Sequence, residues 1–155
     1  MQKNRKDNLS PRIENRKAHH DYFIEQILEC GIALLGSEVK SLRYGKAQIN
    51  EAFCRVEKGK LVLHNAHIDP YSLGNAHHEP LRERALLVHK RELRKLEVEM
   101  KIKGTTLVPL AIYFKDGRAK VEVGVARGKQ QFDKRATIKK KEQDREMRRI
   151  MTQRR

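Results

Sequence analysis

The residues of this chain that could do chemistry are three pairs of histidines, one serine after a glycine, and one glycine-containing run that ends in lysine. The run from Gly124 to Lys129 resembles a phosphate-binding loop, but it has one residue too few between its two glycines. Gln130 also stands where that motif requires Ser or Thr. Ser37 lacks the glycine pattern of a nucleophile elbow. The sequence therefore predicts neither a phosphate-binding loop nor a catalytic serine.

Six of the seven histidines stand in close pairs, which are His19 with His20, His64 with His67, and His77 with His78. His64 and His67 have no third ligand at a spacing typical of a zinc site, so we expect them to be unconnected. For the other two pairs we expect polar linker roles or phosphate contacts. Cys30 and Cys54 form no CxxC motif and are predicted to be free, buried thiols. No set of nucleophile, base and orienting residue is found. We expect a protein without metal or cofactor that is not an enzyme.

The net charge predicts the class of partner. Lys and Arg number 35 against 20 Asp and Glu, a formal net charge of +15 in 155 residues. A compact protein with this charge repels itself unless a polyanion lies nearby. No stretch approaches the roughly 18 consecutive apolar residues of a spanning helix, and the N-terminus has no apolar signal-peptide core. We therefore expect a cytoplasmic protein that binds nucleic acid and not membrane.

The positive charge is concentrated near the C-terminus. Residues 128–155 contain eleven Lys or Arg against four Asp or Glu, so this segment has a net charge of +7. Its few apolar residues cannot form a core, although Met147, Ile150 and Met151 recur at helical spacing. We expect a flexible N-terminal segment 1–14, a barrel domain 15–129, and a basic tail 130–155 that is disordered when free and helical when bound. A solvated tail that only raises affinity is the alternative.

The body of the chain has the patterns of a mainly β fold. Val121, Val123 and Val125 alternate with polar or small residues, which predicts a half-buried strand paired through the turn 115–118 with a strand at 107–114. The other predicted elements are a hairpin joining 52–57 to 61–65, two short strands that meet at Gly31 within 22–35, a helix at 89–100 and a helical turn at 37–44. These elements fit a small antiparallel oligonucleotide-binding-type barrel with flanking helices, and a half-open sheet fits nearly as well.

The aromatic content bears on the kind of nucleic acid. The chain has no Trp and only eight Tyr and Phe, whereas binders of single strands stack successive bases on aromatic rings. We therefore expect recognition of the phosphates, 2′-hydroxyls and shape of a structured RNA. Phe132 is the exception, because it lies in the basic tail and could stack on an RNA base. A loose contact that closes the barrel is the alternative for this residue.

Four blocks in order along the chain resemble the small protein B family, and the match runs from about Asn15 to Met151. The blocks are Asn15 to Glu25, Gly36 to Arg43, Asn65 to Ile68, and Gly128 to Arg135. The resemblance implies an oligonucleotide-binding-type barrel that binds the tRNA-like domain of transfer-messenger RNA and delivers it to the A site of stalled ribosomes for trans-translation. It also implies a tail that lies as a helix in the empty mRNA channel, elongation factor Tu in the delivery complex, and a monomer.

By position, the resemblance assigns two sets of residues. The set expected to bind transfer-messenger RNA is Asn15, Arg16, Lys17, Glu29, Lys40, Arg43, Lys46, Leu87 and Lys120. The set expected to contact the ribosome, at the decoding centre and in the mRNA channel, is Lys129, Phe132, Asp133, Lys134, Arg135, Ile150 and Met151. Without the resemblance, Leu87 would be assigned to the core.

Two other functions are weighed against this one. A ribosomal or initiation-type protein with a small barrel that binds ribosomal RNA directly shares the class and the charge, but the Asp-Lys-Arg and Ile-Met blocks of the tail favour small protein B. A metal-dependent nuclease would need clustered carboxylates, whereas the carboxylates here are mostly dispersed among Lys and Arg.

Overall fold

The structure of the chain is a computed structural model that describes residues 10–74 and 77–153, without the side chains of residues 131 and 132. Its main body is an antiparallel barrel. The barrel strands are β2 (Tyr22–Ile32), β4 (Phe53–Glu57), β5 (Lys60–His64), β7 (Arg84–Leu87), β8 (Thr105–Lys115) and β9 (Arg118–Gly128). They pair in the order β8-β4-β5-β7-β2-β9, and β9 pairs again with β8. The sheet therefore closes, which decides between the barrel and the half-open sheet.

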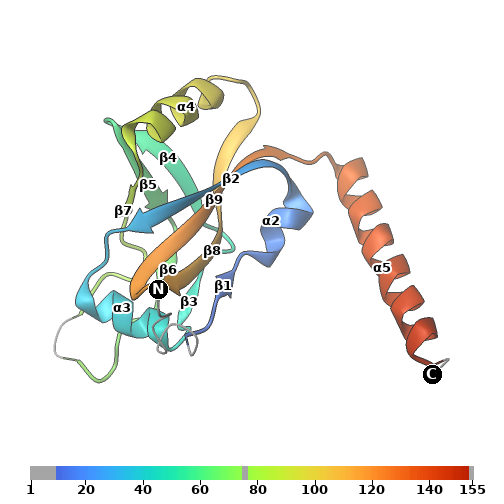
Figure 1. Cartoon of the computed structure of the whole chain (residues 1–155), viewed down its shortest axis with the longest axis horizontal. Coiled ribbons are helices and arrows are strands. Elements are labelled where there is room, and N and C mark those ends of the chain that lie inside the picture. Colours follow the sequence, from blue (N-terminus) through green and yellow to red (C-terminus); the bar gives the residue numbers. More distant parts are fainter. Residues whose placement is uncertain (1–9, 75–76, 154–155) are drawn as a thin grey trace.

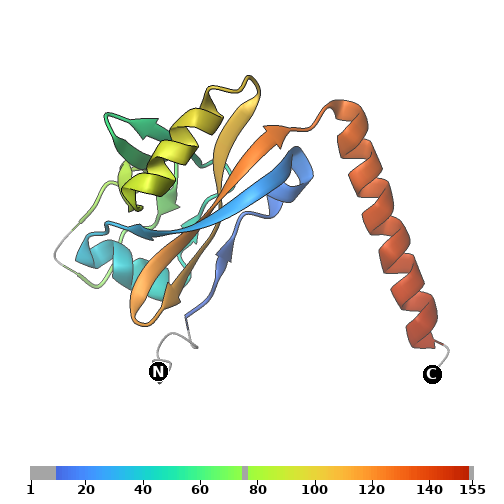
Figure 2. The ribbon, with the colours of Figure 1, turned by 45° about the horizontal axis from the view of Figure 1, so that its top comes forward.

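Within the described residues, three shorter strands and four helices accompany this barrel. The short strands are β1 (Ile13–Glu14), β3 (Ala47–Gln48) and β6 (His67–Ile68), and the helices are α2 (Arg16–Asp21), α3 (Gly36–Arg43), α4 (Lys90–Met100) and α5 (Gln131–Gln153). Figures 1 and 2 show α3 and α4 at opposite ends of the barrel and α5 projecting away from it. No helix within the described ranges 10–74 and 77–153 is long and apolar enough to cross a membrane.

Both predicted hairpins are confirmed, and their turns explain why. Asp116 and Gly117 have φ of 52° and 77°, and Lys58 and Gly59 have φ of 48° and 72°. Positive φ at both central residues is the turn geometry whose twist matches that of paired strands. Glycine reaches this conformation without strain, so the Asp-Gly and Lys-Gly pairs fix the register of the β8–β9 and β4–β5 ladders.

The prediction of two short strands meeting at Gly31 is wrong. The segment forms one strand, β2, with a register shift between Ile24 and Gln26. Gly31 lies inside this strand, paired with Lys120 on β9 and with Leu87 on β7. A Cβ added at Gly31 would lie 3.2 Å from the Cβ of Leu87. The glycine therefore marks a close approach of side chain to backbone rather than a break between strands.

Both cysteines and helix α4 contribute side chains to the hydrophobic core. Cys30 and Cys54 are free and are 1% and 2% exposed, as predicted. Burial, with smaller contributions from Glu92 and Glu29, raises the pKa of the Cys30 thiol to about 12, so it stays neutral. Helix α4 packs Leu96 into the core and begins after His89, whose amide donates to the Glu92 carboxylate at 3.4 Å.

Both ends of the chain carry secondary structure. Ile13 and Glu14, within the segment expected to be flexible, pair with Ile112 and Ala111 of β8 as strand β1. Residues 1–9 of that segment lie outside the described residues. The tail forms α5, which is exposed along most of its length. That this helix is disordered in the free protein and forms on binding stays a prediction.

Candidate nucleic-acid interface

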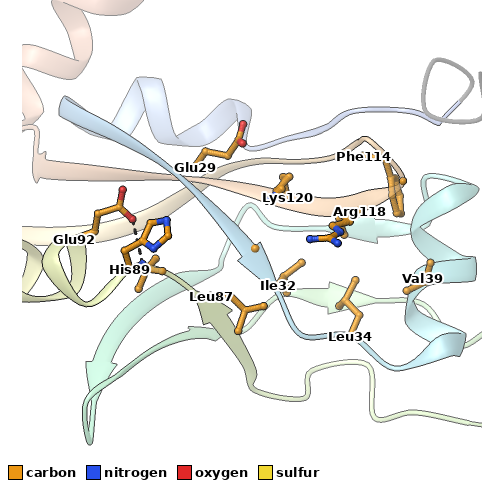
Figure 3. A pocket seen from close by; sticks show the side chains of 14 residues that line it. Glu29, Ile32, Leu34, Val39, Leu87, His89, Glu92, Phe114, Arg118 and Lys120 are labelled. Carbon is orange, nitrogen blue, oxygen red and sulfur yellow. Dashed lines mark hydrogen bonds between the residues drawn. The ribbon is translucent and has the colours of Figure 1, made fainter. Parts of the chain in front are cut away.

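Three of the predicted RNA-binding residues lie together on the outer face of the barrel. Gly31 of β2 pairs with Leu87 on one side and with Lys120 on the other, so these two side chains flank it in one row. Glu29 stands two residues before Gly31 and therefore shares its face of the strand. Residues from β7, β2 and β9 that are far apart in sequence are thus brought to one surface (Figure 3).

A groove of about 700 Å³ runs along this row. Leu87 lies in it and is 61% exposed, so it is a surface residue and not part of the core. The absent side chain of Gly31 gives Leu87 the room to lie over β2. An exposed leucine in a groove that also holds Lys120 can pack against a sugar or base while the ammonium group meets a phosphate.

Glu29 supplies a fixed negative charge in the groove. Its carboxylate accepts a hydrogen bond from the Tyr113 hydroxyl and lies 3.4 Å from Lys115 Nζ. The Tyr113 hydrogen bond and the nearby lysines outweigh partial burial and hold the pKa of Glu29 below its usual value. Burial and the neighbouring Glu29 raise the pKa of Tyr113. A charged carboxylate held in place can accept from base amino groups or 2′-hydroxyls of RNA.

The sequence did not single out three residues that shape this groove. Phe114 and Arg118 line it, and Tyr113 orients Glu29. Tyr113 pairs with Lys120 across β8 and β9, so it belongs to the same row on the outer face. For Tyr113 the available signal was strand parity, because it alternates with the buried Ile112. Phe114 shares the inward parity of Ile112 and packs against the core, so parity does not reveal it.

Asn15 is not at the surface, so its predicted place on the RNA-facing barrel surface is wrong. It is 3% exposed, and its amide nitrogen donates to the Pro109 carbonyl at 2.9 Å. Its Oδ1 accepts from the Ala18 amide at 3.1 Å, which caps the first turn of α2. Asn15 therefore positions Arg16 and Lys17, which are exposed on this helix.

Arg16 and Lys17 lie outside the groove described above. Arg16 lines a separate hollow of about 330 Å³ together with Glu122 and Ile27. Lys17 pairs with Glu51 at 2.7 Å, both largely exposed. Exposed pairs of this kind exchange partners at little cost, so the Lys17 ammonium group is available to a phosphate.

The three basic residues expected near α3 are divided between two sides of that helix. The Arg43 guanidinium lies 3.8 Å from the ring centre of Phe114, which lines the groove. Lys40 lies 5.3 Å from the ring centre of Tyr71. Lys46 follows α3 and is exposed. Only Arg43 is therefore adjacent to the groove.

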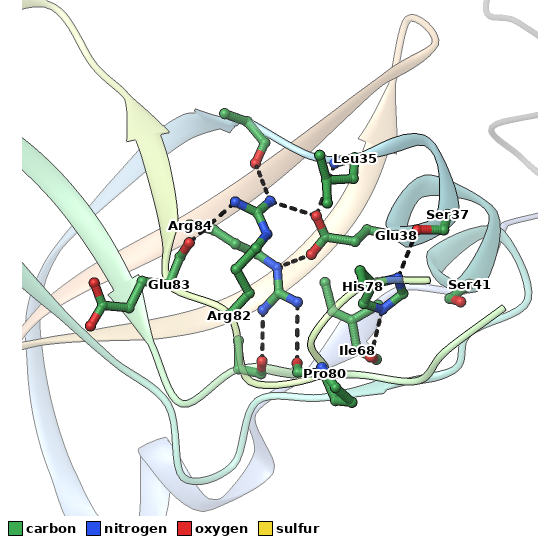
Figure 4. A network of polar contacts seen from close by, with 12 residues as sticks. Leu35, Ser37, Glu38, Ser41, Ile68, His78, Pro80, Arg82, Glu83 and Arg84 are labelled. Carbon is green, nitrogen blue, oxygen red and sulfur yellow. Dashed lines mark hydrogen bonds and ion pairs between the residues drawn. The ribbon is translucent and has the colours of Figure 1, made fainter. Parts of the chain in front are cut away.

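A buried polar network holds α3 against β7. Glu38 and Arg84 are both 0% exposed, and Arg84 Nε donates to the Glu38 carboxylate. Arg82 donates to the other carboxylate oxygen at 2.5 Å, and the Leu35 amide donates to it at 2.9 Å (Figure 4). Burial opposes the charge of Glu38, but these three donors outweigh it and hold the pKa of Glu38 below its usual value. Arg82 and Arg84 thus serve structure and fix the strand that carries Leu87.

The expected linker or phosphate role of His78 is wrong, because this side chain is 7% exposed. Its Nε2 lies 2.9 Å from the Ile68 carbonyl oxygen and its Nδ1 lies 2.8 Å from Ser37 Oγ. Since a carbonyl only accepts, Nε2 carries the proton and Nδ1 accepts from the serine. Ser37 is therefore held in a buried hydrogen bond with His78. The described parts of the chain contain no cluster of three His, Cys, Asp or Glu that could hold a metal ion.

Two of the predicted ribosome-contacting residues anchor the tail to the barrel. Lys129 Nζ donates to the His19 carbonyl at 3.0 Å and to Thr137 Oγ1 at 2.8 Å. Lys134 Nζ lies 3.6 Å from Asp21 Oδ1, on the end of α2. The hydrogen bond with His20, together with Lys134, outweighs burial and holds the pKa of Asp21 below its usual value. Helix α2 therefore sets the direction in which α5 leaves the barrel.

The other predicted tail residues lie along α5. Asp133 is half-buried, and its carbonyl accepts from the Thr137 hydroxyl at 3.0 Å. Arg135 is exposed, and Ile150 and Met151 are 42% and 67% exposed. The side chain of Phe132 lies outside the described residues. The exposed apolar pair near the end of the helix has no partner within the described chain and is available to a binding surface.

Known proteins are similar to this chain over most of its length. The family model described as SmpB protein matches residues 12–153. An SsrA-binding protein of Syntrophotalea carbinolica is 55% identical over 141 residues, covering 90% of this chain and 94% of that protein. An SsrA-binding protein of Geobacillus kaustophilus is 51% identical over 142 residues, covering 91% and 92%.

A chain from a solved structure described as "tmRNA-SmpB: a journey to the center of the bacterial ribosome" shares 52% identity with this chain. It superimposes with a TM-score of 0.67 over 79% of this chain and 87% of that one. The family match spans the barrel, the groove and the tail helix together. The chain therefore belongs to the SmpB protein family.

Proposed function

We propose that this protein binds the tRNA-like domain of transfer-messenger RNA and delivers it to the A site of stalled ribosomes for trans-translation. The observation that carries the proposal is the convergence of Glu29, Leu87 and Lys120 in one exposed groove. These residues offer a hydrogen-bond acceptor, an apolar contact and a phosphate-binding cation. That combination suits a folded RNA better than a charged surface alone, which would bind any polyanion.

The tail has a second role in this proposal. Helix α5 is basic, leaves the barrel at α2, and carries the exposed pair Ile150 and Met151 near its end. We propose that it occupies the empty mRNA channel, where its cations face ribosomal RNA and the apolar pair docks. Asp133, Lys134 and Arg135 at its start, with Lys129 and Phe132, would meet the decoding centre.

The names of the relatives bear on which RNA the protein binds. The relatives are named SsrA-binding proteins, which supports transfer-messenger RNA over direct binding of ribosomal RNA as a ribosomal or initiation-type protein. We propose that the protein works in the cytoplasm as a monomer, with elongation factor Tu in the delivery complex. Its role is to bind and position RNA rather than to catalyse a reaction.

The division of labour between barrel and tail can be tested with two variants. Deleting residues 130–155 should leave tight binding to transfer-messenger RNA but abolish peptide tagging on stalled ribosomes. Lys120→Ala should weaken RNA binding and lower the slope of log affinity against log salt by about one. Lys58→Ala, at an exposed hairpin turn, is the matched control for loss of one charge. Loss of RNA binding on deletion of the tail would contradict the proposal.

A further inference from the structure

Two tyrosines that are distant in sequence form an aromatic pair beside α3. Tyr44 directly follows this helix, and Tyr71 lies in the loop after β6. Their ring centres are 6.3 Å apart and their planes differ by 18°, which is a stacked arrangement. Tyr44 is 67% exposed, so it presents a large part of its ring to solvent. The low aromatic content of the sequence led us to expect no base-stacking surface, so this pair was not predicted.

Hydrogen bonds to the backbone hold the pair in place. Ser41 Oγ donates to the Asp69 carbonyl at 2.6 Å, and the Asp69 amide donates to the Lys46 carbonyl at 3.0 Å. The Tyr44 amide donates to the Ser41 carbonyl at 3.2 Å. These bonds tie the loop that carries Tyr71 to the end of α3. The aromatic surface is therefore formed before any ligand binds, which lowers the entropic cost of binding.

The charges around the pair favour a polyanion. Lys40 and Tyr44 stand four residues apart, so they are neighbours on one side of the helix. Lys46 is exposed just beyond it. The carboxylate of Asp69 lies 3.1 Å from His67 Nδ1. The acidic residue within α3, Glu38, is fully buried and paired with arginines.

Helix α3, which ends next to Tyr44, also borders the groove. Val39, on α3, lines the groove, and Arg43 on the same helix lies over Phe114 of the groove wall. A structured RNA that fills the groove would therefore pass along α3. Tyrosine rings stack on any base and lysines meet its phosphates, so the surface suits an unpaired nucleotide better than a protein segment.

We propose that Tyr44 stacks on one unpaired base of the bound RNA, with Lys40 and Lys46 contacting the phosphates beside it. The inference rests on the proposed RNA-binding function and adds a contact outside the groove. Bases in loops are accessible to such stacking because they are not held in a helix. One stacked base of this kind adds affinity without reading sequence.

The test uses the full-length protein and a transcript of the tRNA-like domain of transfer-messenger RNA. Tyr44→Leu removes the ring but keeps an apolar side chain, and Tyr44→Phe keeps the ring. We expect Tyr44→Leu to bind about 5- to 150-fold more weakly, the range for loss of one stacked base. Tyr44→Phe should stay within about twofold of the natural protein. The chain has no Trp and four Tyr, so the difference in tyrosine quenching between the natural protein and Tyr44→Leu on RNA binding reports the contribution of Tyr44, and the variant should show less quenching.

Lys120→Ala, measured in parallel, separates this inference from the proposed function. If Lys120→Ala weakens binding and Tyr44→Leu does not, the stacking contact is refuted while the groove stands. If neither variant changes the affinity for the transcript, both proposals fail. If Tyr44→Leu binds RNA normally but lowers tagging on ribosomes, the aromatic pair contacts another component of that assembly and the inference is overturned.

Discussion

The buried pair of Glu38 and Arg84 offers the sharpest prediction about stability. Replacing Glu38 by Ala leaves the Arg84 guanidinium fully buried, with only the neutral carbonyls of Ala66 at 2.8 Å and Pro80 at 3.1 Å as acceptors. Removing one partner of a buried pair costs about 3–5 kcal/mol, because the other charge stays uncompensated. Arg82 adds little to this cost, since its side chain is 34% exposed and can be rehydrated.

A double variant distinguishes the energy of the ion pair from the energy of side-chain packing. Glu38→Met combined with Arg84→Met replaces both charges by apolar side chains and removes the uncompensated charge. We expect the double variant to lose at least about 2 kcal/mol less stability than Glu38→Met and Arg84→Met lose together. This difference is in the range typical of strongly coupled residues. The free energy of unfolding is measured by urea titration followed by circular dichroism. Single variants that cost under about 1 kcal/mol, or a double variant equal to the sum, would refute the reasoning.

The same pair gives a pH dependence whose sign follows from the lowered pKa of Glu38. A carboxyl whose pKa is lower in the folded state contributes stability that is fully present above its unfolded pKa, about 4.3. That contribution is lost as the pH falls through the folded pKa. We therefore expect Glu38→Gln to flatten the acid limb of the stability curve compared with the natural protein. An unchanged acid limb would show that Glu38 is not the group that titrates.

Three other predictions concern the groove and the tail. Gly31→Ala should displace Leu87 and weaken RNA binding in titrations, because the added Cβ would lie 3.2 Å from the Cβ of Leu87. Gly128→Ala is the control, because its added Cβ would meet nothing within 4 Å. Asp21→Ala removes a half-buried pair with Lys134 and should cost only about 1 kcal/mol of stability. It should speed hydrogen exchange at the start of α5 and lower tagging while leaving RNA affinity unchanged. In solution NMR the tail of the free protein should give sharp, mobile amide signals, and uniformly protected tail amides would contradict folding on binding.

The hairpins and the amphipathic helix were predictable because their signals are local. The turns at Lys58-Gly59 and Asp116-Gly117 need positive φ, and residues that tolerate it are visible in the sequence. The spacing of Leu86, Leu93, Leu96 and Met100 likewise predicted the helix at 89–100, although Leu86 itself lies on β7. Helix α2 was missed because it has only six residues, too few to show an apolar period, although its cap, Asn15, makes a local bond to the Ala18 amide.

The groove could be predicted only through the family resemblance. Leu87 looks like a core residue in the sequence, and its exposure results from the pairing of β7 with β2 at Gly31. The charges of Arg84 and Glu38 gave no sign of burial, because their pairing joins residues 46 positions apart. The Tyr44 and Tyr71 pair depends in the same way on long-range contacts that periodicity does not reveal.

The most direct test of the RNA-binding proposal is competition binding with the full-length protein. Transfer-messenger RNA would compete against equal masses of tRNA and of unstructured RNA over a series of salt concentrations, because non-specific affinity falls steeply with salt. The proposal predicts a preference for transfer-messenger RNA that persists as salt rises, since the groove adds contacts other than charge. Equal binding to all three RNAs that disappears as salt rises would contradict it and leave only a basic RNA-binding barrel.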